Sequence, residues 1–236
     1  MKIYAMSDLH GHLPTLSIPE VDVVTISGDI VPLDIQGKLA RSISWYLLRF
    51  IPWAEKLPCR KVFVIAGNHD FFFETQISRK NVGTLGPVGE ILLCENPSDK
   101  VVYLEDREYN FEGKKFWGTP WIPDLNRWAF YGNSAKLKEM FGMIPENVDV
   151  LLTHTAPRIG NAGKVLQTSA FNYGSNFGCV ELAEAIERKK PKYVFCGHIH
   201  SGDHNETVAE CGTKIYNVSI KDEDYLPTYS GKLIEI

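Results

Sequence analysis

Residues 61–70 read KVFVIAGNHD, and this stretch combines a short apolar run with residue types that bind metal ions. The run from Lys61 to Ala66 is rich in Val, Ile and Phe, and it is too short for a core helix. It therefore predicts a buried β-strand. The residues that follow it, Gly67-Asn68-His69-Asp70, would lie just beyond the carboxyl end of that strand.

The same pattern occurs four more times in the chain. The other apolar runs are Ile3 to Met6, Val21 to Ile26, Val148 to Leu152 and Tyr193 to Cys196, and they precede Asp8-Leu9-His10, Gly28-Asp29, His154 and Gly197-His198-Ile199-His200. In open α/β sheets the ligand crevice lies outside the carboxyl ends of the strands. The five runs therefore predict one convergent polar site.

The segments before two of these runs have helical periodicity. Apolar residues recur at helical spacing over about 37–56, so a helix connects the strands at 21–26 and 61–66. Strand, helix and strand form a βαβ unit, which implies parallel pairing and a right-handed connection. A second helix is predicted from Val180 to about Lys189, before Pro191.

Other strand-like segments are short and separated by turn residues. They lie at 101–104, 108–111, 114–117, 207–210, 214–218 and 232–236, with turns at Glu112-Gly113 and Cys211-Gly212. They suggest a second sheet. We expect an α/β fold of two packed sheets flanked by helices, forming a single domain over residues 1–236.

The composition narrows the class of protein. The chain has 236 residues, of which 44% are hydrophobic, and a formal net charge of −4. It therefore lacks the strongly basic charge that is typical of nucleic-acid-binding proteins. Five cysteines without a CxxC pair argue against a disulfide framework and a thiolate zinc site. With no apolar stretch long enough to span a bilayer, we expect a cytoplasmic protein without a membrane partner.

The polar residues after the five runs supply nitrogen and oxygen ligands. They are Asp8, His10, Asp29, Asn68, His154, His198 and His200. Such a set suits Mn²⁺, Fe, Zn²⁺, Ni²⁺ or Co²⁺ better than Ca²⁺. Seven ligands are too many for one tetrahedral ion but suffice for two ions that share a carboxylate. Two metals roughly 3.5–4 Å apart can clamp the attacking and leaving oxygens at phosphorus and supply hydroxide, so phosphate-ester hydrolysis is the predicted reaction.

The series Asp-x-His, Gly-Asp, Gly-Asn-His-Asp, a lone His and Gly-His-x-His, over residues 8–200, resembles the motifs of the calcineurin-like metallophosphoesterases. The resemblance implies a double β-sandwich flanked by helices in four α/β/β/α layers. It implies that Asp8, His10 and His200 hold one metal, that Asn68, His154 and His198 hold the other, and that Asp29 bridges them. It also implies a catalytic role for His69, which would stabilise the phosphoryl group or protonate the leaving oxygen.

A closer resemblance is to the metallophosphoesterase-domain-containing branch, which is related to the class III cyclic nucleotide phosphodiesterases. Its segments are similar to Gly118-Thr119-Pro120-Trp121, His154-Thr155-Ala156-Pro157 and Gly178-Cys179-Val180-Glu181-Leu182. The resemblance implies hydrolysis of a small phosphodiester, such as a cyclic nucleotide, by attack of a metal-bound hydroxide on phosphorus. Residues 158–176 depart from the branch's pattern, which leaves substrate choice open.

Several further residues are candidates for contact with substrate or for orienting His69. His12 lies in the same loop as His10, and Arg158 follows the strand of His154, so both could reach a phosphate. Residues 116–131 are rich in aromatic side chains, of which Trp121 or Trp128 would line the site while Trp117 and Phe130 would enter the core. Exposed aromatics there could also join two copies of the chain. Asp70 would either orient His69 or cap the following loop, and Asp34 is a rival orienting partner.

Three other functions compete with a phosphodiesterase. A phosphomonoesterase acting on nucleotides or phosphoproteins would use the same ligands. A nuclease would need a groove for polymer, which neither the charge nor an added domain suggests. A metal-bound interaction protein without catalysis would not need His69, which is present.

Overall fold

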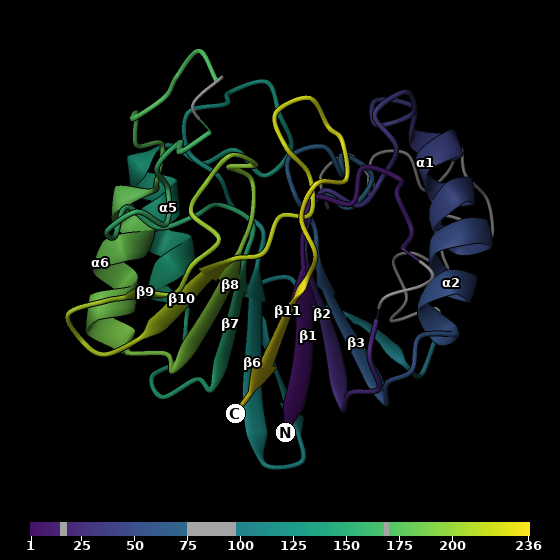
Figure 1. Ribbon diagram of the computed structural model, residues 1–236, viewed down its shortest axis with the longest axis horizontal. Helices are drawn as coiled ribbons and strands as arrows, with labels where there is room; N and C mark the ends of the chain where they lie inside the picture. The colour runs from purple at the N-terminus through teal and green to yellow at the C-terminus, as the bar shows by residue number, and fades with distance from the viewer. Residues whose placement is uncertain (15–17, 75–97, 168–169) are drawn as a thin grey trace.

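Two β-sheets face each other in the centre of the molecule, and helices cover their outer faces (Figure 1). The computed structural model describes residues 1–14, 18–74, 98–167 and 170–236. The first sheet has the order β11-β1-β2-β3-β4. Its strands are β1 (Lys2–Met6), β2 (Val23–Ser27), β3 (Lys61–Ile65), β4 (Val101–Tyr103) and β11 (Lys232–Glu235). The strands from β1 to β4 are parallel, and β11 is antiparallel to β1.

The second sheet has the order β5-β6-β7-β8-β10-β9. Its strands are β5 (Arg107–Phe111), β6 (Lys114–Thr119), β7 (Val150–Thr153), β8 (Tyr193–Cys196), β9 (Thr207–Val208) and β10 (Lys214–Asn217). The inner strands β6, β7, β8 and β10 are parallel, and the edge strands β5 and β9 are antiparallel to their neighbours. Glu112 and Gly113 form the β5–β6 turn with left-handed backbones, as a tight hairpin requires.

The expected crossover helix at 37–56 is helical but not uniform. It consists of α1 (Leu39–Trp45), a π-helical segment η1 (Tyr46–Phe50) and α2 (Ile51–Glu55). In η1 the N–H of Ile51 bonds to the carbonyl of Tyr46, five residues earlier. Pro52 has no N–H to give to the preceding turn, and a widened turn accommodates that loss.

In the part of the chain that the structure describes, two helices cover the second sheet. The predicted helix α6 (Val180–Lys189) ends at Lys190, which is left-handed with φ 53°. The other helix, α5 (Ser134–Gly142), was not predicted from the sequence and begins after Asn133, whose side chain accepts a hydrogen bond from the N–H of Lys136. In the described part of the chain, no helix is long and apolar enough to cross a membrane.

Three apolar clusters hold the four layers together. Tyr46 and Phe50 of η1 pack on the outer face of the first sheet, and Leu182 and Ile186 of α6 pack on the outer face of the second. Between the sheets the ring centroids of Phe63 and Phe116 lie 4.4 Å apart. The expected α/β double sandwich in four α/β/β/α layers is therefore confirmed.

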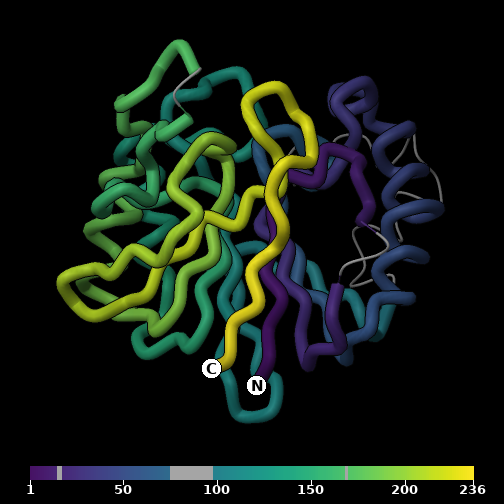
Figure 2. The backbone as a smooth tube through the Cα atoms, in the orientation of Figure 1, coloured from purple at the N-terminus to yellow at the C-terminus, as the bar shows by residue number. Residues whose placement is uncertain are grey.

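The division of strands between the sheets differs from the expectation in two places. Strands β4 and β11 were grouped with the second sheet, but they pair with β3 and β1 at the edges of the first. The strands that precede His154 and His198 belong to the second sheet. Because the carboxyl ends of β1, β2 and β3 meet those of β7 and β8, the predicted residues lie where both sheets end together (Figure 2).

Candidate metal centre

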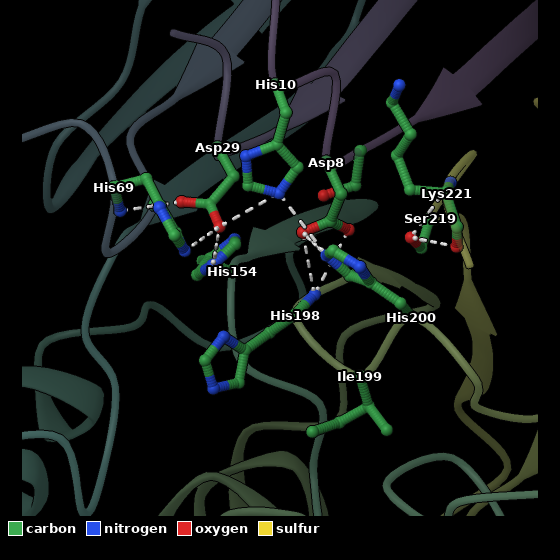
Figure 3. Close-up of polar contacts among 12 residues, drawn as sticks. Asp8, His10, Asp29, His69, His154, His198, Ile199, His200, Ser219 and Lys221 are labelled. Atoms are coloured by element: carbon green, nitrogen blue, oxygen red, sulfur yellow. Dashed lines mark hydrogen bonds and ion pairs between the residues drawn. The ribbon is translucent and has the colours of Figure 1, made fainter. Parts of the chain in front are cut away.

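Asp8 and Asp29 lie at the centre of the site, directly after β1 and β2 (Figure 3). Both residues have left-handed backbones, with φ 58° for Asp8 and 52° for Asp29, a conformation found at functional turns. The two loops are tied together because the N–H of Asp8 bonds to Gly28 O at 3.0 Å and that of His10 bonds to Asp29 O at 2.9 Å. This pairing fixes the two carboxylates side by side.

Histidines from four loops surround the two carboxylates. The Nε2 atom of His200 is 3.4 Å from Asp8 Oδ1, and Nε2 of His10 is 3.6 Å from Asp29 Oδ2. The Nε2 atom of His154 is 3.4 Å from Asp29 Oδ2 and 2.9 Å from Asn68 Oδ1. Among the described residues, three groups could each hold a metal, with ligand atoms within 4.8 Å of one another: Asp8, His10 and His200; His10, Asp29 and His69; and Asp8, Asp29 and His154.

His198 takes a different position from the other predicted ligands. Its backbone N–H donates to both oxygens of Asp8 at 3.1–3.2 Å. Its imidazole is turned away from the two carboxylates (Figure 3), with its centroid 5.0 Å from that of His154. The structure thus brings six of the seven predicted ligand side chains together and leaves the His198 ring on the wall beside them.

Glycines in the ligand motifs allow the loops to approach the carboxylates closely. A Cβ atom on Gly67 would lie 2.6 Å from Cε1 of His154 and still closer to the Asp29 carboxylate. A Cβ atom on Gly197 would lie 2.7 Å from Cβ of Ser7 and would also collide with the Asp8 carboxylate. These two glycines are therefore required by packing against the site.

The site contains two buried carboxylates whose negative charges need compensating cations. Asp8 and Asp29 are almost completely buried, and in the described ranges histidine is the only basic residue paired with them. Burial is the largest single influence and raises the pKa of each carboxyl, but the surrounding histidines together lower it by more, so the pKa of Asp8 and that of Asp29 both lie below the usual value. Buried carboxylates are stable only when paired or bound to metal. With nitrogen and oxygen donors around them, the residues fit divalent transition metals.

The pKa values of the imidazoles shift in opposite directions within this buried, negatively charged site. Burial lowers the pKa of His154, but Asp29, Asp8 and the Ser27 carbonyl together raise it by more, to about 9. Burial lowers the pKa of His10 to about 4 and that of His198 to about 3. His10 and His198 are therefore neutral at pH 7, as a metal ligand must be, whereas His154 has to lose a proton first.

His69 lies beside Asp29, with its Nε2 3.7 Å from Asp29 Oδ2, and is held by a residue that the sequence did not indicate. Its backbone N–H donates to Asp29 Oδ1 at 2.8 Å, and its Nδ1 bonds to the amide oxygen of Gln36. Asp70 instead accepts hydrogen bonds from the N–H groups of Ile30, Val31 and Gly67. Asp70 therefore joins the loop at Ile30 and Val31 to the start of its own motif. Among the described residues its carboxylate neither bonds to the His69 ring nor caps the loop that follows it, the two roles that were expected.

The loop at 221–228 forms a second feature that the sequence did not indicate. The carbonyl of Asp222 accepts a hydrogen bond from Nδ1 of His200 at 3.0 Å, which leaves Nε2 facing Asp8. The ring of Tyr225 packs edge-on against His10 and His200, with centroids 4.9 and 5.1 Å away. Glu223 Oε1 accepts hydrogen bonds from the backbone and hydroxyl of Ser201. The loop therefore orients one candidate ligand and covers two.

A cavity of about 220 Å³, here called the metal-side cavity, opens over the carboxylates. Its walls are formed by Asp29, Asn68, His69, Leu125, Trp128, His198, His200, Glu223 and Tyr225. Trp128 contacts the His69 ring at a centroid distance of 4.4 Å, whereas Trp117 and Phe130 are buried in the core as expected.

The three residues expected to bind substrate lie outside the walls of this cavity. Nε1 of Trp121 donates to Asp106 Oδ2 at 2.7 Å. His12 lines a separate cavity with Tyr4 and Tyr229, and Arg158 is exposed after β7. Contact of these three residues with substrate stays a prediction.

Comparison with known proteins places the chain among metal-dependent enzymes. The family model described as calcineurin-like phosphoesterase matches residues 1–202. The human metallophosphoesterase domain-containing protein 1 is 28% identical over 246 residues, covering 100% of this chain and 71% of the relative. A UPF0046 protein of Caenorhabditis elegans, C25E10.12, is 29% identical over 246 residues, which cover 100% of this chain and 81% of the relative.

Solved structures share the fold at lower identity. One crystal structure superposes with a TM-score of 0.67 at 14% identity, covering 99% of this chain and 98% of the other. The phosphopantetheinyl hydrolase of Mycobacterium tuberculosis superposes with a TM-score of 0.54 at 14% identity, covering 99% of this chain and 95% of the other. At this identity the likeness concerns the fold alone.

Proposed function

Because the chain belongs to the calcineurin-like phosphoesterase family, and is thus a metal-dependent phosphoester hydrolase, we propose that it is a phosphodiesterase acting on a small phosphodiester such as a cyclic nucleotide. The charge of the metal-side cavity is the observation that supports a diester. No lysine or arginine lines this cavity within the described ranges, and Glu223 adds a carboxylate to its wall. A diester carries one negative charge, whereas a monoester carries nearly two at pH 7. The cavity is therefore better suited to the diester.

We assign the metal ligands according to the clusters and the motif order. Asp8, His10 and His200 would hold one ion, Asn68 and His154 would hold the other, and Asp29 would bridge them. His198 completes the second set if its ring rotates toward His154. Two such ions would supply Lewis acidity and would activate water at neutral pH.

The chain's own residues would then position the substrate and move a proton. Gln36 holds Nδ1 of His69, so Nε2 is the nitrogen available to the cavity. In its imidazolium form, His69 would donate Nε2–H to the phosphoryl or leaving oxygen. Trp128 and Tyr225 flank this position, with ring centroids 4.4 and 6.4 Å from that of His69.

The test compares bis(p-nitrophenyl) phosphate with p-nitrophenyl phosphate. Protein stripped with a chelator is supplied in turn with Mn²⁺, Ni²⁺, Co²⁺, Zn²⁺ or Fe²⁺. We expect metal-dependent turnover that favours the diester, that is lost in Asn68→Ala, and that is retained in Asn110→Ala, an exposed asparagine on the edge strand β5. Preference for the monoester would replace the proposal with a phosphomonoesterase. Two bound metals without turnover of either ester would favour a binding role.

A further inference from the structure

A second, larger cavity adjoins the metal-side cavity. It has a volume of about 450 Å³, and we call it the side pocket. Leu125, His198 and Glu223 line both cavities, so the two lie side by side. A phosphoester whose phosphorus lies over Asp29 could therefore extend one of its organic groups into the side pocket.

Apolar side chains form most of the wall of the side pocket. Val165 and Ile199 are buried, with 4% and 7% of their surface exposed. Phe171 is fully exposed and Phe177 is 45% exposed. Large exposed aromatic side chains beside a pocket gain free energy when a flat apolar group covers them. The volume suffices for one aromatic ring system.

The charged groups of the side pocket are acidic. Asp124 and Glu223 contribute carboxylates, and no lysine or arginine of the described ranges lines it. The Oε1 atom of Glu223 is engaged by Ser201, while no hydrogen bond to its Oε2 is present among the described residues. The pocket therefore opposes a second anionic group and offers acceptors to N–H or O–H donors.

Resting on the proposed phosphodiesterase function, we propose that the side pocket binds an uncharged aromatic substituent of the phosphodiester and selects against substituents that carry a further negative charge. The residues that carry this selection are Leu125, Phe171 and Phe177 for the aromatic group and Asp124 and Glu223 for the charge. Phe171 and Phe177 belong to the segment 158–178, which follows the strand of His154.

Binding of two non-hydrolysed, singly charged diester analogues tests the aromatic preference. Methyl phenylphosphonate and methyl methylphosphonate differ only in the group that would enter the side pocket. By calorimetry on Mn²⁺-loaded protein, we expect the phenyl compound to bind about tenfold or more tightly. In Phe177→Ala the ratio should fall severalfold. Tyr173→Ala, an exposed aromatic of the same segment that does not line the pocket, should retain the ratio.

A third analogue, methyl (4-carboxyphenyl)phosphonate, tests the charge selection. We expect it to bind more weakly than the phenyl compound, and Asp124→Asn should reduce that difference. Asn tolerates the left-handed backbone at position 124, where φ is 62°, so this variant changes charge with little strain. Equal binding of all three analogues would overturn the inference.

The binding readout separates this inference from the proposed function. Preference for the phenyl compound in a protein that turns over no diester would refute the phosphodiesterase and retain the pocket. Turnover of bis(p-nitrophenyl) phosphate without any phenyl preference would support the phosphodiesterase and refute the assignment of the side pocket.

Discussion

The Nδ1 atom of His69 bonds to the amide oxygen of Gln36, so a neutral side chain orients the candidate catalytic histidine. Burial lowers the pKa of His69, and Asp29 opposes that effect. An amide holds the ring without adding a further negative charge. The charge of a protonated His69 would therefore be balanced by Asp29 rather than by its orienting partner.

Changing Gln36 should affect catalysis more than stability. For Gln36→Ala we expect kcat on bis(p-nitrophenyl) phosphate to fall roughly tenfold to hundredfold, as for other residues that orient a site group. Gln36→Glu should raise the pKa of His69 and shift the alkaline limb of the kcat profile upward. Steady-state kinetics between pH 5 and 10 measure both effects. Lys38→Ala, in the same loop, serves as the control, and an unchanged kcat in Gln36→Ala would rule out the orienting role.

Binding of metal should stabilise the fold because it neutralises Asp8 and Asp29, which are buried together. At free metal about 100 times Kd, one site contributes about 2.7 kcal/mol. We therefore expect Tm to rise by roughly 5–10 °C when stripped protein is reloaded with Mn²⁺. Differential scanning calorimetry should show this rise in Asp34→Asn, whose carboxylate is exposed, and a much smaller one in Asp29→Asn. Equal shifts in the two variants would contradict the assigned bridge.

Proton release should accompany metal binding because of His154. Its pKa is raised to about 9 in the metal-free protein, so His154 is protonated at pH 7 and must lose that proton to become a ligand. The apparent affinity for Mn²⁺ should therefore increase from pH 7 to pH 9 and level off above it. Calorimetry in two buffers of different ionisation enthalpy would count about one or more protons at pH 7 and fewer at pH 10. Binding without proton release at pH 7 would contradict this prediction.

The sequence predicted the positions of the candidate ligands because their signal is local. Each run, such as Lys61 to Ala66, ends at the residue types that bind metal, and parallel strands bring such ends together. The pairing of β4 and β11 at the edges of the first sheet depends on tertiary contacts, so segment composition did not reveal it. Gln36 and Tyr225 lie in loops without periodicity, and only the folded chain brings them to His69 and His10.

The close approach of Gly67 to the site yields the last prediction. An added Cβ would collide with the Asp29 carboxylate and with His154, and a buried carboxylate held by the N–H of His69 has little freedom to move away. Gly67→Ala should therefore lower the free energy of unfolding by about 1–3 kcal/mol. It should also reduce the bound metal below the wild-type stoichiometry, because Asp29 is displaced.

Gly142→Ala provides the matched control for this effect. Gly142 ends α5 with nothing within 4 Å of its added Cβ and with a backbone that alanine adopts readily, so the same change should stabilise the protein by about 0.4–1 kcal/mol. Urea denaturation measures the stability of both variants, and elemental analysis of dialysed protein measures the bound metal. Full metal content in Gly67→Ala would show that the site tolerates the extra methyl group and that the glycine is not required by the position of Asp29.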